Sequence, residues 1–137
     1  MQTVYPKARM KFLKGDIAWE TDAFLAIAVD STYVYSEGDE FRDDITGVLG
    51  SAALTGMTAL DYGWADASDA TITGMTPGGV VAGFIIARNV GTAATDDLIW
   101  YANSHANTTP ISRVVDGSGS MTFSFANGTG RIFQLGS

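Results

Sequence analysis

The chain contains 137 residues, 46% of them hydrophobic and 11% aromatic, which predicts one globular domain with a single core rather than a disordered segment. It has no cysteine, and this excludes disulfides, a thiolate nucleophile and cysteine-bound zinc. The formal net charge of −7 repels phosphate backbones, so nucleic acid is not an expected partner.

The N-terminal segment 1–20 lacks the uninterrupted apolar core of a secretory signal. The longest apolar run, residues 78–87, has the length of a strand and is too short to cross a membrane. We therefore expect a soluble protein that is synthesised in a cytoplasm and has no membrane partner.

The charges are segregated along the chain. Residues 1–14 contain four basic side chains and no acid, a local charge of +4, whereas residues 15–137 contain the other four basic residues and all fifteen acids, a net charge of −11. The basic segment is predicted either to bind an acidic surface or only to solvate one face of a helix. Its basic residues are Lys7, Arg9, Lys11 and Lys14.

A short helix is predicted near the N-terminus. Pro6 suits the first helical position, and Gly15 suits the left-handed residue that ends a helix. Tyr5, Ala8 and Phe12 recur at helical spacing and form an apolar stripe. Because so short a helix is unstable alone, this stripe must pack on another surface.

Short strands are predicted after this helix. Residues 24–29 are apolar at every position, as in a strand buried on both faces. Residues 80–87 form the strongest strand candidate, predicted to pair with 98–102 as a hairpin. The remaining strand candidates are segments 17–19, 32–35, 48–60 and 70–75.

The C-terminal region predicts a second hairpin. Hydrophobic residues alternate with polar ones from Met121 to Phe125, and Asn127-Gly128 is a dipeptide favoured in two-residue hairpin turns. Residues 131–135 would form the returning strand.

Roughly eight short strands separated by Gly, Asp, Ser and Thr turns predict a mainly β fold. We expect a single antiparallel β-sandwich or jelly-roll-like domain over residues 16–137. Residues 1–15 would form an N-terminal arm or helix, a candidate anchoring element whose removal leaves the β domain folded.

The segment 36–45, SEGDEFRDDI, holds five carboxylates. Its spacing does not match the ligand positions of an EF-hand loop. The metal alternative is a looser calcium site formed by Glu37, Asp39 and Asp43.

The structural interpretation of this segment is one short helix near residues 38–46. Ser36 and Asp39 have the spacing of a capping box, and the acids complement the positive end of a helix dipole. Phe41 and Ile45 would then lie on one face and hold the helix against the sheet. This interpretation accounts for the acids without a metal.

Enzyme motifs are not found in the sequence. His105 is the only histidine and lies in a polar loop, there is no nucleophile elbow, and the glycine-rich stretches lack the features of phosphate loops. We predict no enzymatic activity, no catalytic residue, no cofactor and no metal. Tyr62 and Trp64 lie in a predicted loop, where they would contact a partner or a sugar or else fill the core.

Short motifs along nearly the whole chain carry a family resemblance. In chain order they are Tyr5-x-Lys7-Ala8, Phe12-Leu13-x-Gly15-Asp16-Ile17, Thr21-Asp22, Ala28-Val29-Asp30, Phe41-x-Asp43-Asp44-Ile45, Gly91-Thr92-Ala93-Ala94-Thr95, Leu98-Ile99-x-Tyr101, Asn127-Gly128 and Ile132-Phe133-x-Leu135. In these motifs the chain resembles small structural proteins of tailed-bacteriophage virions. It departs from their pattern at Phe125, where Trp is expected, and through residues 50–80.

The resemblance implies a non-enzymatic virion component, located in the head as a decoration (cement) protein or in the tail. As a decoration protein it would bind the major capsid protein or other virion subunits and stabilise the head lattice, self-associating as a trimer. Its expected interface consists of Tyr5 and Phe12, inserted into the lattice, and Lys7, Arg9 and Lys11, paired with lattice acids. The alternative is a tail component or a tail-borne receptor- or glycan-binding module that uses Tyr62, Trp64 and the loop 103–110.

Overall fold

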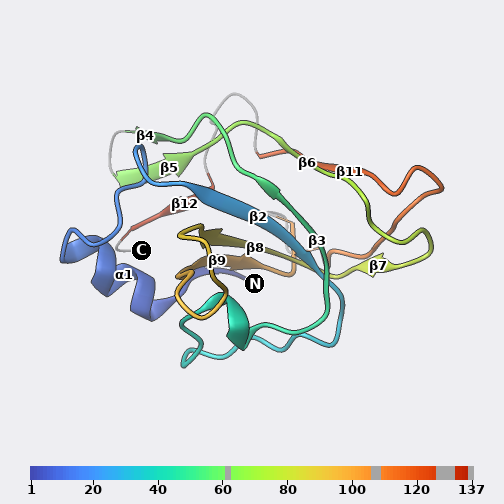
Figure 1. The fold of residues 1–137 in the computed structure, drawn as a ribbon, viewed down its shortest axis with the longest axis horizontal. Helices are drawn as coiled ribbons and strands as arrows, with labels where there is room; N and C mark the ends of the chain where they lie inside the picture. Colours follow the sequence, from blue (N-terminus) through green and yellow to red (C-terminus); the bar gives the residue numbers. More distant parts are fainter. Residues whose placement is uncertain (61–62, 106–108, 126–131, 136–137) are drawn as a thin grey trace.

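The computed structural model describes residues 1–60, 63–105, 109–125 and 132–135, without the side chain of Gln134. The protein is mainly β, as predicted. Three smaller sheets pack with one five-stranded antiparallel sheet around a single core (Figure 1).

The five-stranded sheet has the order β1-β9-β8-β2-β3. The apolar run predicted to be buried on both faces is the strand β2, and the predicted hairpin is formed by β8 and β9. The bounds are β1 Gln2–Val4, β2 Phe24–Val29, β3 Val48–Ala53, β8 Gly83–Arg88 and β9 Leu98–Ala102.

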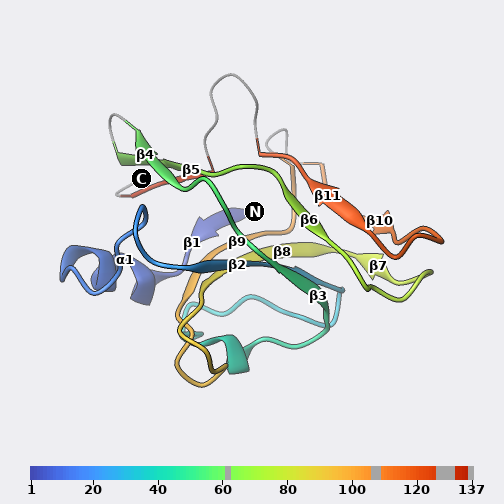
Figure 2. The same cartoon turned by 45° about the horizontal axis from the view of Figure 1, so that its top comes forward.

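Two of the smaller sheets lie on one side of the central sheet, as Figure 2 shows. One has the order β12-β5-β4 and the other pairs β6 with β11, while a third pairs β7 with β10. The bounds are β4 Thr58–Leu60, β5 Trp64–Asp66, β6 Ala70–Ile72, β7 Val80–Val81, β10 Arg113–Val114, β11 Met121–Phe123 and β12 Phe133–Gln134.

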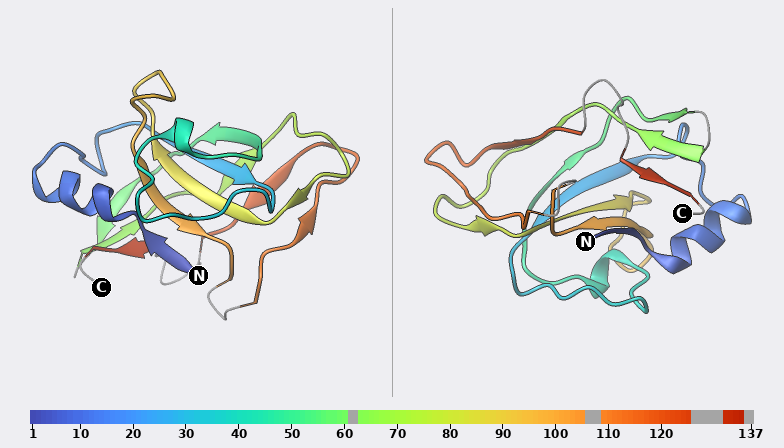
Figure 3. Two further views of the ribbon diagram at one scale, coloured as in Figure 1. Left: turned by 90° about the horizontal axis from the view of Figure 1, so that it is seen from below. Right: turned by 180° about the vertical axis from the view of Figure 1, so that it is seen from behind.

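The pairs β6/β11 and β7/β10 belong to one bent two-stranded ribbon. Ile72 pairs with Met121 and Val80 pairs with Val114, and between these pairs the Met75 amide donates to the Gly119 carbonyl over 2.9 Å. The ribbon bends from the layer of the smaller sheets toward the plane of the central sheet (Figure 3). Strands that bend in this way pass from one sheet of a β-sandwich to the other.

The predicted C-terminal hairpin is wrong in its pairing. β11 pairs with β6 and β12 pairs with β5, so the two segments belong to different sheets. Asn127-Gly128 lies outside the described residues. The alternation of residues 121–125 identified a strand, but alternation does not specify the neighbouring strand.

Replacement of Gly119 by alanine is expected to destabilise the protein by about 2 kcal/mol or more. Gly119 has φ +69°, and an added Cβ would lie 2.6 Å from the Met75 carbonyl oxygen, a backbone atom that cannot rotate away. The matched control is Gly117→Ala in the same loop, where an added Cβ would meet no atom within 4 Å. Urea unfolding of both variants checks this; equal stabilities would contradict the described bend.

The two faces of the central sheet pack against different partners. Ala26, Ile86 and Trp100 are cross-strand neighbours on the face that meets the smaller sheets. On that face the rings of Phe84 and Phe123 lie 4.2 Å apart. The opposite face carries Tyr101, whose ring meets tyrosines of the segment 30–46.

The N-terminal residues are an integral part of the fold. β1 is an edge strand paired with β9, and the helix α1 (Pro6–Leu13) follows it directly. Pro6 occupies the predicted first position, and Gly15 has the predicted positive φ, +77°. The description of residues 1–15 as a separable arm is therefore corrected, because their backbone completes the sheet.

The predicted helix at 38–46 is reduced to one 3-10 turn, η1 (Arg42–Asp44). Its cap also differs from the prediction: the carboxylate of Asp44, rather than Ser36 or Asp39, accepts hydrogen bonds from the amides of Glu40 (2.8 Å) and Phe41 (3.0 Å). Residues 17–19 and 32–35 are not strands, although Ile17, Trp19 and Tyr33 are buried.

Candidate functional site

The aromatic residues expected to insert into a lattice are directed into the protein. Tyr5 is 0% exposed, and its hydroxyl lies 2.8 Å from that of Tyr33. Phe12 is half-buried, with its ring centroid 6.3 Å from that of Phe133. Tyr5 is therefore unavailable to a partner, and Phe12 offers only part of its ring.

Two of the expected basic contacts are internal ion pairs. The ammonium groups of Lys7 and Lys11 lie 3.0 Å and 2.9 Å from the carboxylate of Glu40, and Lys11 also pairs with Asp97. Arg9 is half-buried and lines a small hollow beside β1. The positive segment therefore binds acids of its own chain, including one from the acidic stretch.

These pairs belong to a larger charge cluster at the turn between β8 and β9. Arg88 lies 3.2 Å from Asp22 and 3.4 Å from Asp97. Arg42 Nε donates to Asp96 Oδ2 over 2.7 Å, and Asp96 is fully buried. The cluster joins α1, the acidic segment and the central sheet, so much of the charge segregation seen in the sequence is neutralised by folding.

Hydrogen bonds from Lys11 and Lys7 lower the pKa of Glu40. Burial opposes the charge of Lys11, but its hydrogen bonds to Asp97 and Glu40 outweigh burial and raise its pKa. A carboxylate with a lowered pKa stabilises the fold above its unfolded pKa, and a lysine with a raised pKa stabilises it below its own unfolded pKa. The charge cluster therefore contributes most to stability at pH values above the unfolded-state pKa of Glu40 and below the unfolded-state pKa of Lys11.

We expect Glu40→Gln to lower the Tm at pH 7 by a few degrees. The difference from wild type should shrink as the pH falls from 7 through the lowered folded-state pKa of Glu40, because below that pKa the carboxyl group is protonated in both the folded and the unfolded protein. Thermal unfolding over this pH range measures the effect. Glu37→Gln is the control, since no described lysine or arginine forms an ion pair with this exposed acid. If Glu40→Gln lowered the Tm by the same amount at every pH, the loss of stability would not come from the charge of Glu40.

The proposed calcium ligands Glu37, Asp39 and Asp43 do not converge. Asp39 accepts hydrogen bonds from the Tyr33 hydroxyl (2.6 Å) and the Ser36 amide (3.3 Å), which hold it toward the tyrosine cluster. Within the described ranges, no group of three or more His, Cys, Asp or Glu side chains is arranged to hold a metal ion. The acidic segment instead contributes a turn cap, a tyrosine contact and partners for lysines.

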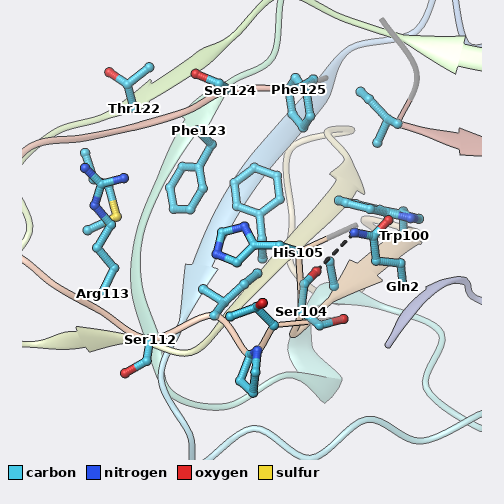
Figure 4. Close-up of a pocket in the computed structure, with 17 residues that line it drawn as sticks. Gln2, Trp100, Ser104, His105, Ser112, Arg113, Thr122, Phe123, Ser124 and Phe125 are labelled. Carbon is cyan, nitrogen blue, oxygen red and sulfur yellow. Dashed lines mark hydrogen bonds between the residues drawn. The ribbon is translucent and has the colours of Figure 1, made fainter. Parts of the chain in front are cut away.

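A cleft of about 650 Å³ lies beside β11. Its apolar surface comes from the central sheet and β11, and includes Phe84, Trp100, Phe123 and Phe125. Figure 4 shows His105 on the side of Phe123 and Gln2 on the side of Trp100. Gln2 Nε2 donates to the Ser104 carbonyl over 3.0 Å, which ties β1 to the rim.

Polar side chains surround the apolar surface of this cleft. Arg113, Ser112 and Thr122 are exposed at its rim, and none of the described lining residues is Asp or Glu. The His105 amide donates to the Thr109 carbonyl over 2.8 Å. In a chain of net charge −7, a cleft that contains Arg113 without an acid favours an anionic group in its ligand.

Trp64 and the described loop residues of the glycan-binding alternative line different hollows. Tyr62 lies outside the described residues. Trp64 is half-buried in β5 and lines the small hollow with Arg9, whereas the loop residues 104, 105, 109 and 110 line the larger cleft. The two hollows share Gln2, Trp100 and Ile132 as common lining residues, so they adjoin each other.

Comparisons with protein-family models, curated proteins and solved structures found no match to this chain. Among the helices that the structure describes, none is long and apolar enough to cross a membrane.

The cleft was not predicted from the sequence. The alternating residues 121–125 were available as a signal of a half-buried strand, and Trp100 lies in the predicted strand 98–102, where it is buried. What could not be anticipated is that these residues face each other across a hollow, because their separation in space depends on sheet packing.

Proposed function

We propose that this chain is a non-enzymatic virion structural protein, a decoration or cement protein that binds and stabilises the head lattice. One observation carries the proposal: two motifs of the family resemblance that are distant in sequence form a single unit. The Asp43 amide donates to the Ala93 carbonyl over 3.1 Å, and the Arg42 amide donates to the Asp96 carbonyl over 2.8 Å. A family resemblance built from short motifs of common residues is stronger evidence when the motifs contact one another in the folded protein.

The charge cluster strengthens this interpretation. Lys7, from the first motif of the resemblance, pairs with Glu40. Lys11, which lies between the first two motifs, pairs with Glu40 and Asp97 beside the motifs at 41–45 and 91–95. The resembling segments therefore build the framework that holds α1 on the sheet. We infer from this that the resemblance extends to the fold as well as to isolated residues.

We propose that the lattice contact is made by the exposed face of α1 instead of by the residues first expected. Leu13 is 89% exposed and Met10 is 43% exposed, and Lys14 is exposed beside them. We define these three residues as the anchor face. It retains the apolar and basic character predicted for the arm, while Tyr5, Lys7 and Lys11 serve the fold. Association of several copies around a lattice axis, as a trimer, remains part of the proposal.

Addition of purified protein to expanded capsids that lack it tests this function. We expect stoichiometric binding and increased resistance of the capsid to heat. The double variant Met10→Glu, Leu13→Glu should bind about tenfold more weakly or worse, because two apolar contacts become charged. Val34→Glu, at another exposed apolar residue (79% exposed), is the matched control. Absence of wild-type binding would refute the decoration role.

The tail alternative is supported by the aromatic cleft, which resembles a ligand site in size and composition. As a receptor- or glycan-binding module, the protein would block adsorption of the phage to host cells and bind sugars on a glycan array. A decoration protein should do neither, so the two assays separate the functions.

A further inference from the structure

The cleft beside β11 reaches an unpaired strand edge. Its lining includes all three residues of β11 and the two residues that follow it, although successive side chains of a strand point to opposite faces. A hollow above one face would meet only alternate residues, so this cleft extends around an edge of the strand. β6 occupies one edge of β11 and contributes no lining residue. The other edge has no strand partner in the described part of the chain.

The facing wall is also a continuous stretch of backbone. Residues 109–113 all line the cleft as the chain runs into β10. The Ile111 amide donates to the Asn103 carbonyl over 2.9 Å, which fixes this wall to the end of β9. The hollow therefore lies between two backbone segments, and its 650 Å³ is in the range that holds a short peptide or a compact ligand.

The surface chemistry of the cleft selects among possible occupants. Phe84 and Trp100 provide an apolar floor on which apolar side chains can pack. A free strand edge offers amide and carbonyl groups that an acyl chain cannot satisfy, whereas a peptide backbone can. Arg113, with no acid in the described lining, favours a carboxylate in the occupant.

We infer that the cleft accepts an extended segment of another protein chain, added as a strand along the free edge of β11. Apolar side chains at alternate positions of the segment pack on Phe84 and Trp100, and an Asp or Glu pairs with Arg113. We call this position along the free edge of β11 the strand site. Its biological role rests on the proposed function, because an added strand is the kind of contact by which one virion subunit would hold its neighbour.

Selection of random heptapeptides on the purified, full-length protein tests the strand site. We expect enrichment of sequences with alternating apolar residues and at least one acid. Ser124→Trp, which places a large ring in the cleft, should reduce binding of the selected peptides at least tenfold. Thr73→Trp is the matched control, because Thr73 is exposed near β6 and does not line the cleft.

A charge exchange provides a second measurement on a surface residue. Selection on Arg113→Glu should replace the enriched acids by Lys or Arg, whereas Lys14→Glu, at an exposed site outside the cleft, should leave the preference for acids unchanged. Amide chemical shifts of the ¹⁵N-labelled wild type should change mainly at residues 109, 111–113 and 121–125 when the best peptide is added.

Three results would overturn the strand site: no enriched peptide, equal binding to Ser124→Trp and wild type, or shifts located elsewhere. Binding of the fluorescent probe 8-anilinonaphthalene-1-sulfonate without any peptide enrichment would identify a small-molecule cleft and would also overturn it. These selections use the isolated protein, so their failure leaves the capsid-binding result unaffected, and failure of capsid binding leaves the peptide result unaffected.

Discussion

Replacement of Tyr5 by alanine is expected to lower the free energy of unfolding by about 3–5 kcal/mol, the range for deleting a large buried aromatic side chain. Tyr5 is fully buried, and its ring centroid lies 5.3 Å from that of Tyr35. Alanine would leave a cavity between α1 and the tyrosines that cover the sheet. It would also remove the hydroxyl partner of Tyr33. Urea unfolding followed by circular dichroism measures the loss.

Tyr5→Phe separates packing from hydrogen bonding. The ring is retained, and the Tyr33 hydroxyl still donates to Asp39, so the expected cost is only about 1 kcal/mol. If Tyr5→Ala cost no more than Tyr5→Phe, the N-terminal segment would not belong to the cooperative core. In that case removal of residues 2–14 would leave a folded domain, whereas the pairing of β1 with β9 predicts that this truncation unfolds the protein.

Asp96→Ala is expected to destabilise the protein by about 3 kcal/mol. The carboxylate is 0% exposed and accepts hydrogen bonds from Arg42 Nε and the Val90 amide, each over 2.7 Å. Alanine would leave both donors without this acceptor in a protein interior. We expect the lower end of the range for broken buried ion pairs, because the Arg42 side chain is 31% exposed and water can solvate it. Thermal and urea unfolding measure the effect.

Asp43→Ala is the matched control, since this neighbouring carboxylate is exposed and should change stability by less than about 0.5 kcal/mol. Asp96→Asn should be intermediate, because an amide oxygen can still accept from Val90 but carries no charge for Arg42. Equal effects of Asp96→Ala and Asp43→Ala would show that the buried pair does not connect the acidic segment to the β8–β9 turn.

Local patterns predicted most of the secondary structure. Residues 24–29 and 80–87 are apolar at nearly every position, a pattern of strand length that is satisfied only by burial on both faces. Pro6 and Gly15 marked the helix correctly, because each has a backbone preference independent of its neighbours. The helix near 38–46 was not predicted correctly, since the backbone is extended again at Ile45 (φ −90°, ψ 149°) and only one tight turn forms.

The residues predicted to form a lattice interface show what the sequence alone could not decide. Lys7 and Lys11 had the composition of a binding surface, but Glu40 and Asp97 are their partners. Tyr5 had the spacing of a helical stripe, and the stripe is covered by tyrosines of the same chain. A sequence pattern states that a side chain needs a partner; it does not state whether that partner is internal.

By itself, the sequence determined a single β-rich domain, its main buried strands and the start and end of its N-terminal helix. These properties follow from side-chain periodicity and from the backbone preferences of proline and glycine. Only the tertiary structure decided which charges are neutralised internally and which strand edge borders a cleft. Lys11 and Asp97 are 86 residues apart in the chain, and their contact depends on which strands become neighbours, a choice made by the packing of the entire core.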